Sequence, residues 1–137
     1  MRSFFCGATN IGGPGSGTIY EMTRVESHWK ETRLTRFFAN GVDGSGPECV
    51  VIFDKAGNIY GTTYGGGKYG YGTVFELIHS TTGWKQKILH SFNGTTGGGF
   101  LPFGVIKDGR GNLYGTTQCG GSDRDCGGYG VVFEILQ

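Results

Sequence analysis

Apolar residues occur along the chain in short runs that are separated by glycine-rich and polar stretches. In the middle of the chain these runs occupy residues 49–53, 58–63, 73–78 and 84–92. The first run is apolar throughout, as in a strand buried on both faces, and the second is rich in aromatic and β-branched residues. No stretch combines a helical period with capping residues at both ends. The pattern therefore predicts four β-strands and an all-β chain.

Short polar connections join two pairs of these runs. Residues 54–58 read Asp-x-x-Gly-Asn, in which the Asp side chain caps its own backbone and Gly accepts a positive φ. Residues 79–83 form a second short turn. Tight turns connect antiparallel neighbours, so we expect an antiparallel meander in chain order.

This four-strand segment is repeated along the chain. Three blocks of similar sequence recur in the same order at a spacing of about 54 residues. This regular spacing indicates a structural repeat. The matching blocks are residues 54–63 with 108–117, residues 17–22 with 72–77 and 130–135, and residues 29–37 with 84–92; residues 5–9 are a degenerate copy of 59–63.

A repeat of about 54 residues with four antiparallel strands is typical of a β-propeller blade. The repeat boundaries predict a single repeat domain, with a partial blade at 1–38, a full blade at 49–92 and a partial blade at 103–137. About two and a half blades cannot close a ring of roughly four to eight. We therefore expect a homo-oligomer, most simply a dimer, to complete the ring. An open arc of blades is the alternative.

Composition and charge exclude several classes of partner. The chain has 29 glycines among 137 residues, but its 14% aromatic content is too high for a disordered glycine linker. The formal net charge of +1 gives no basic surface for nucleic acid or for an anionic membrane. No apolar run approaches the ~18 residues of a membrane-spanning helix. We expect neither a nucleic-acid nor a membrane partner, and no cofactor.

The loops of the predicted meander fall on two faces. The loops after the second strand of each repeat, together with the connections at 40–48 and 93–102, share one variable face, where binding residues are expected. Aromatic side chains among glycines could stack on sugar rings or on peptide side chains; alternatively, they pack the loops against one another. The candidate ligand-binding residues are Tyr64, Tyr69, Tyr71, Asp123, Arg124, Asp125 and Tyr129.

Two cysteines flank the longest of these loops. Cys119 and Cys126 are predicted to form a disulfide in an oxidising compartment. A metal site that combines them with Asp123 and Asp125 is disfavoured, because Cys-x6-Cys is not a usual zinc spacing and no histidine lies nearby in the sequence.

The chain lacks a recognisable catalytic motif. Glu21, Glu76 and Glu134 share one repeat position, whereas a catalytic acid is needed only once, so we expect them to pair with Lys or Arg on a neighbouring strand. No nucleophile elbow or phosphate-binding loop is present. We therefore favour a non-enzymatic role.

The repeated motif resembles a known family. Residues 54–63, a Gly-Gly loop and Gly-Thr-Val-Phe-Glu-Leu at 72–77 are similar to the GloVer tandem repeat of large bacterial proteins, over nearly the whole chain. The resemblance implies tandem arrays, often exported and surface-anchored, without an established biochemical activity. Residues 1–7 do not contain the apolar region of a secretory signal, so the localisation is left open.

The sequence thus predicts a repeat protein that acts as a ligand-binding or protein-interaction module through its variable loop face, with a carbohydrate or a peptide as ligand. One alternative is a carbohydrate-active propeller enzyme whose carboxylates face the ring axis; a site present in one blade only would favour it. The other is an inactive fragment of a larger array.

Overall fold

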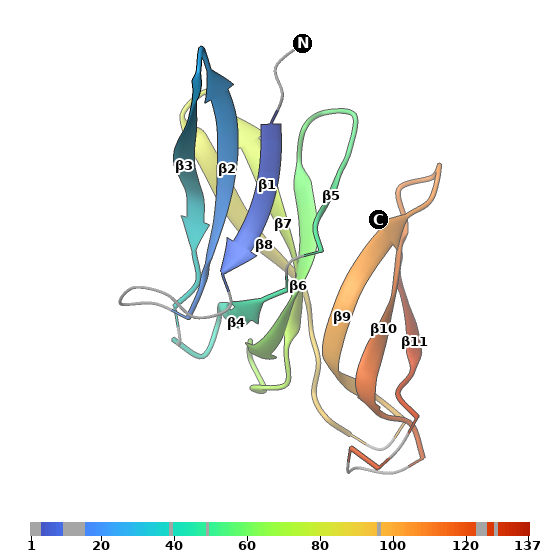
Figure 1. Cartoon of the computed structure of the whole chain (residues 1–137). Helices are drawn as coiled ribbons and strands as arrows, with labels where there is room; N and C mark the ends of the chain where they lie inside the picture. Colours follow the sequence, from blue (N-terminus) through green and yellow to red (C-terminus); the bar gives the residue numbers. More distant parts are fainter. Residues whose placement is uncertain are drawn as a thin grey trace.

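The computed structural model describes residues 4–9, 16–38, 40–48, 50–95, 97–122, 126–127 and 129–137. Within these residues the regular structure consists of eleven strands in three antiparallel sheets, with no helix and no closed barrel. The predicted all-β class with antiparallel pairing is confirmed. Figure 1 shows the three sheets side by side.

The sheets follow one another along the chain. The N-terminal sheet contains, in order, β1 (Phe4–Thr9), β2 (Thr18–Val25) and β3 (His28–Arg36). The middle sheet contains β4 (Gly44–Pro47) and β5 (Ile52–Phe53), both paired with β6 (Ile59–Gly66), and then β7 (Thr73–Ser80) and β8 (Gly83–Ser91). The C-terminal sheet contains β9 (Gly99–Lys107), β10 (Leu113–Gly120) and β11 (Val132–Ile135).

The first strand of the middle repeat differs from the prediction. We expected one strand at 49–53 and loops at 40–48 and 93–102, whereas β4 and the start of β9 lie within those loops and β5 covers only two residues. The middle sheet has one more residue between Pro47 and Ile52 than the C-terminal sheet has between the equivalent proline and isoleucine. A single bulged glycine absorbs the mismatch in β9, but the longer stretch divides β4 from β5.

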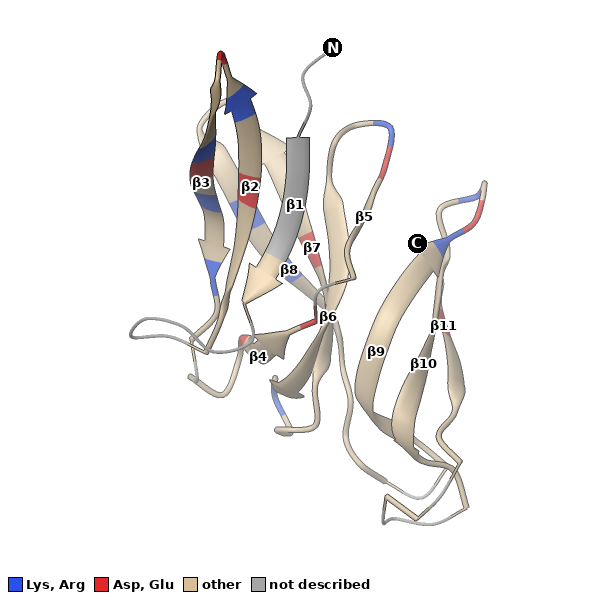
Figure 2. Cartoon of the chain, in the orientation of Figure 1, with Lys and Arg blue, Asp and Glu red and all other residues tan. Residues whose placement is uncertain are grey.

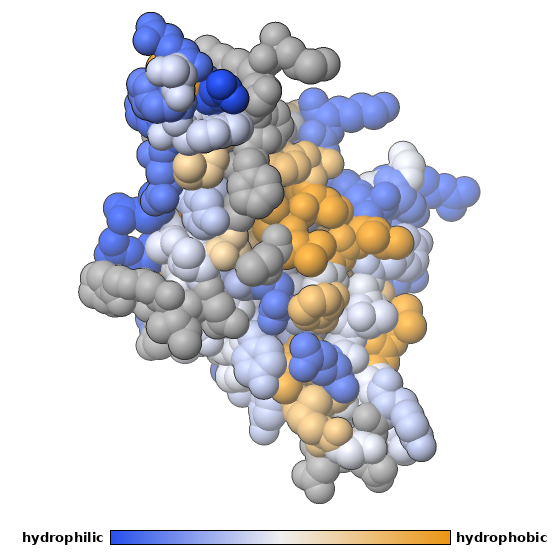
Figure 3. Space-filling model, in the orientation of Figure 1, coloured by the Kyte–Doolittle hydropathy of each residue, from blue (hydrophilic) through white to orange (hydrophobic). Residues whose placement is uncertain are grey.

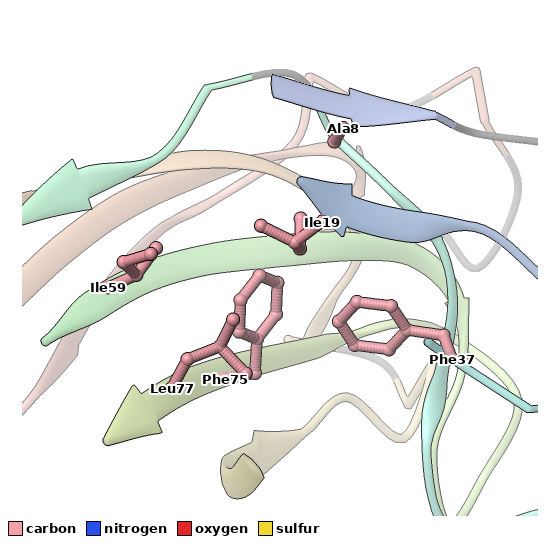
Figure 4. Packing of buried hydrophobic residues seen from close by; sticks show 6 residues of the cluster. All are labelled: Ala8, Ile19, Phe37, Ile59, Phe75 and Leu77. Atoms are coloured by element: carbon pink, nitrogen blue, oxygen red, sulfur yellow. The ribbon is translucent and has the colours of Figure 1, made fainter. Parts of the chain in front are cut away.

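The middle sheet is covered on both faces. Its contact with the N-terminal sheet is centred on Phe75, whose ring meets that of Phe37 edge-on at 5.0 Å. Figure 4 shows side chains from the two sheets pointing toward one another. The buried residues of this first core are Ala8, Ile19, Phe37, Ile59, Phe75 and Leu77.

The contact between the middle and C-terminal sheets repeats this arrangement. Phe133, at the position of Phe75, packs edge-on against Phe92 at 5.1 Å. The buried residues of this second core are Tyr60, Val74, Phe92, Val105 and Leu113. The middle sheet therefore turns one set of positions toward the N-terminal sheet and another toward the C-terminal sheet, and the two outer sheets use the equivalent positions for these contacts.

Glycines inside the strands make room for aromatic rings. Gly61 pairs with Phe75 across β6 and β7, and a Cβ on this glycine would lie 2.7 Å from the Phe75 ring. Gly115 pairs with Phe133 in the same way. At both glycines the space that a side chain would need is filled largely by a phenylalanine ring, and at Gly115 the Gly104 carbonyl oxygen also comes close.

Glycines at a second repeat position lie where successive sheets come into contact. Gly17 and Gly72 both have positive φ, of 111° and 100°, and each contacts a proline of the following sheet, Pro47 and Pro102 respectively. Any side chain here would meet that proline, so glycine sets the spacing of the sheets.

Candidate functional site

The turns at Asp54 and Asp108 are built by their own side chains. Asp54 Oδ1 accepts hydrogen bonds from the backbone N–H groups of Ala56 and Asn58, both at 2.9 Å, and Oδ2 accepts from the Asn58 amide at 3.0 Å. Asp108 repeats this arrangement. Burial alone would raise the pKa of both carboxyl groups, but the hydrogen bonds outweigh it and hold each pKa below its usual value.

A tyrosine links each turn to a glutamate. The Tyr60 hydroxyl contacts Glu76 Oε1 at 2.8 Å and Asp54 Oδ2 at 3.1 Å, and burial together with these carboxylates raises the pKa of Tyr60. Tyr114 donates to Glu134 Oε1 at 2.7 Å in the same way. The glutamates at 76 and 134 thus have tyrosine partners where we expected Lys or Arg, because the tyrosine stands directly opposite on the paired strand.

A lysine from the C-terminal sheet covers the buried tyrosine. Lys107 Nζ lies 3.8 Å from the centre of the Tyr60 ring and 3.6 Å from Asp54 Oδ2. On the same interface the backbone N–H of Gly104 donates to Thr62 Oγ1 at 2.9 Å. A further hydrogen bond runs from the Leu101 N–H to the Tyr71 carbonyl at 3.0 Å, so the contact between the middle and C-terminal sheets combines apolar residues with a lysine cation and directed hydrogen bonds.

The C-terminal sheet presents the same set of positions on its far side. Its cross-strand rows run from Ile106 through Tyr114 to Glu134, and from Phe103 through Thr116 to Val132. These correspond to positions that the middle sheet buries, since Val74 is 0% exposed and Val132 is 79% exposed. We call this surface the outer face; it consists of Phe103, Ile106, Tyr114, Thr116, Val132 and Glu134.

The outer face carries an apolar cavity of about 340 Å³. Figure 3 shows apolar residues gathered over β5 and β9. Its chemistry suits the burial of another apolar surface, with the Tyr114–Glu134 pair as a polar anchor. The lining residues include Val50, Phe103, Ile106, Tyr114, Thr116 and Val132.

The structure places the predicted tyrosines differently from one another. Tyr71 packs edge-on against Phe100 at 5.5 Å and lies over Gly94. Tyr69 lies beneath the Lys68 ammonium group, which is 5.1 Å from its ring centre, while Tyr64 and Tyr129 are exposed. The remaining candidates, Asp123, Arg124 and Asp125, lie outside the described residues.

Cys119 and Cys126 are joined by a disulfide in the structure. Cys119 lies near the end of β10, and its backbone carbonyl accepts a hydrogen bond from the Thr117 hydroxyl at 2.9 Å. The bond therefore ties the loop to the strand from which it leaves.

Replacement of both cysteines by serine is expected to lower the free energy of unfolding by about 2–3 kcal/mol, because the short closed loop restricts the unfolded chain. Urea denaturation followed by circular dichroism measures the change. A thiol reductant should produce a similar loss in the wild type and none in the double variant. An unchanged wild-type midpoint under reductant would contradict the prediction.

The described residues contain neither a metal-binding cluster nor a membrane-spanning helix. No group of three or more His, Cys, Asp or Glu side chains in this part of the chain could hold a metal ion. The same residues contain no helix with the length and apolarity needed to cross a bilayer.

Sequence reasoning did not single out the outer face. In the sequence, Phe103, Ile106 and Val132 look like ordinary strand residues. Their exposure depends on whether another sheet packs against them, which the local sequence does not show. The available signal was the repeat itself: Val132 takes the position of Val74, so the two should have equivalent surroundings unless a covering sheet is absent.

Comparison with known proteins gives one match. A family model described as the Gloeobacter/Verrucomicrobia repeat matches residues 2–137. Neither the curated proteins nor the solved structures give a match.

Proposed function

Since the chain belongs to the Gloeobacter/Verrucomicrobia repeat family, we propose that it is a protein-interaction module whose three sheets are successive blades of a propeller-like assembly. Further copies of the chain, most simply one, complete the ring by stacking sheet on sheet. The assembled loops then form the surface that binds a carbohydrate or a peptide.

One repeat position carries the proposal. Ile19, Val74 and Val132 are equivalent; the first two are 0% exposed between sheets, whereas Val132 is 79% exposed. Burial of an aliphatic or aromatic side chain from water contributes about 1.5–3 kcal/mol. Ile106 and Phe103 lie on the same face as Val132, so covering this face gives a substantial driving force for association.

The exposed tyrosines near the loops and the partners of the glutamates favour a binding module over an enzyme. The loops after β6 and β10 lie at the same end of the molecule and expose Tyr69 and Tyr129, and Tyr64 is exposed near the end of β6. Tyrosine rings offer flat apolar surfaces with a polar tip, which suits sugar rings and peptide side chains. Glu76 and Glu134 both bind tyrosine hydroxyl groups, which favours a structural role for them.

Light scattering coupled to size exclusion tests the assembly. We expect the wild type to run as a discrete dimer and the double variant Ile106→Asp, Val132→Asp to run as a folded monomer near 14.7 kDa. Val42→Asp is the matched control, because Val42 is equally exposed but lies away from the outer face. A monomeric wild type at all concentrations would overturn the proposed assembly.

A further inference from the structure

We infer that the second copy docks head to tail: the outward surface of its N-terminal sheet covers the outer face, with Arg24 of the second copy beside Glu134. This inference rests on the proposed association of copies and adds its orientation and its pairing residues. Two sheet contacts within the chain and the charges of the two exposed surfaces support this orientation.

The outward surface of the N-terminal sheet is defined by alternation along its strands. Ile19 and Leu34 pack toward the middle sheet, so their neighbours Tyr20 and Arg33 point away from it. The residues that share this side, paired across β2 and β3, are Tyr20 with Arg33, Met22 with Glu31, and Arg24 with Trp29.

The two surfaces are complementary in charge and in apolar character. The N-terminal surface combines two arginines and one glutamate with Tyr20, Met22 and Trp29, and the Arg24 guanidinium lies 6.0 Å from the centre of the Trp29 ring. In the outer face Glu134 is the charged residue, beside the apolar side chains of Phe103, Ile106 and Val132. Figure 2 shows charges of both signs on β2 and β3, and few on β9 to β11 apart from the turn.

The contact between the N-terminal and middle sheets provides the register. Glu21 of the N-terminal sheet lines a cavity of about 200 Å³ together with His79 and Trp84 of the middle sheet. His79 and Trp84 occupy the repeat positions of Arg24 and Trp29, and Glu21 occupies that of Glu134. Stacking an N-terminal sheet on the outer face in this register therefore sets Arg24 beside Glu134.

A face-to-face dimer is the competing arrangement. It would pack the outer face against itself and bring two Glu134 side chains to the interface without a cation from the partner. The contacts inside the chain favour a head-to-tail arrangement instead. Asp54, Tyr60 and Glu76 are the repeat equivalents of Asp108, Tyr114 and Glu134, and the following sheet supplies a cation to them through Lys107. Like charges at an interface disfavour association, whereas opposite charges direct it.

Charge reversal tests the orientation. Arg24→Glu alone and Glu134→Arg alone should each weaken dimerisation at least tenfold, as measured by sedimentation equilibrium. An equimolar mixture of the two variants should recover dimers, since each contact then pairs one arginine with one glutamate, either as in the wild type or with the two charges exchanged. Lys30→Glu, a reversal on the opposite side of the same hairpin, should have little effect.

The outcomes separate this inference from the proposed function. Wild-type dimers that Arg24→Glu leaves unchanged would overturn the head-to-tail orientation while association itself stands. A wild type that stays monomeric would overturn both. Because Glu134→Arg also removes the hydrogen bond from Tyr114, Glu134→Gln is measured beside it; it keeps an acceptor for Tyr114 and should weaken the dimer by a smaller factor.

Discussion

Phe75→Ala is expected to lower the free energy of unfolding by about 3–5 kcal/mol, the range for removal of a buried aromatic side chain. The ring is fully buried, meets Phe37 edge-on and fills the space over Gly61. Its removal leaves a cavity that two separate sheets line, and neither sheet can collapse into it without breaking its own strand pairing. Urea denaturation followed by tryptophan fluorescence measures the loss, since Trp84 packs against this core.

Phe38→Ala is the matched control for this prediction. Phe38 is 45% exposed, and its ring is 5.9 Å from the Arg36 guanidinium, so its removal should cost less than about 1 kcal/mol. Equal losses for the two variants would show that the first core does not hold the N-terminal and middle sheets together.

Gly72→Ala is expected to cost about 2–4 kcal/mol, from backbone strain and overpacking together. The glycine has φ of 100°, and an added Cβ would lie 2.5 Å from Pro102 Cδ and 2.6 Å from the Thr63 carbonyl oxygen. The first contact belongs to the C-terminal sheet, so the substitution forces the two sheets apart. Thermal and urea denaturation both report the loss.

Gly70→Ala separates the two causes. Gly70 lies in the same loop with φ of 85°, but a Cβ there would have no neighbour within 4 Å, so only the backbone strain of about 1 kcal/mol is expected. If the Gly70 and Gly72 variants lose the same stability, the proline contact between the sheets contributes nothing.

The features that were predictable from the sequence are those that neighbouring residues determine. The Asp54 and Asp108 turns followed from Asp-x-x-Gly-Asn, because their hydrogen bonds join residues at most a few positions apart. The all-β class followed from the short apolar runs. The break between β4 and β5 was not predictable, since it depends on how residues 48–51 match the fixed length of β6 opposite.

The candidate site was harder to predict because it depends on packing between sheets. Val74 and Val132 have similar sequence surroundings, and only the presence of a following sheet makes one buried and the other exposed. Glu76 was assigned a cationic partner because its pairing with Tyr60 across β6 and β7 is invisible in the chain order. The alternative that loop tyrosines pack the loops against one another fits Tyr71, but the sequence did not identify Phe100 as its partner.

The packing of the middle sheet has a consequence for how repeat chains of this kind can lengthen. This sheet meets a predecessor through Phe75 and a successor through Val74, so both halves of the contact are encoded within one repeat. Duplication of the gene segment for this sheet would insert a layer that already matches its neighbours on both sides. Growth of the array therefore requires only recombination between similar stretches of DNA, with no new binding surface to evolve.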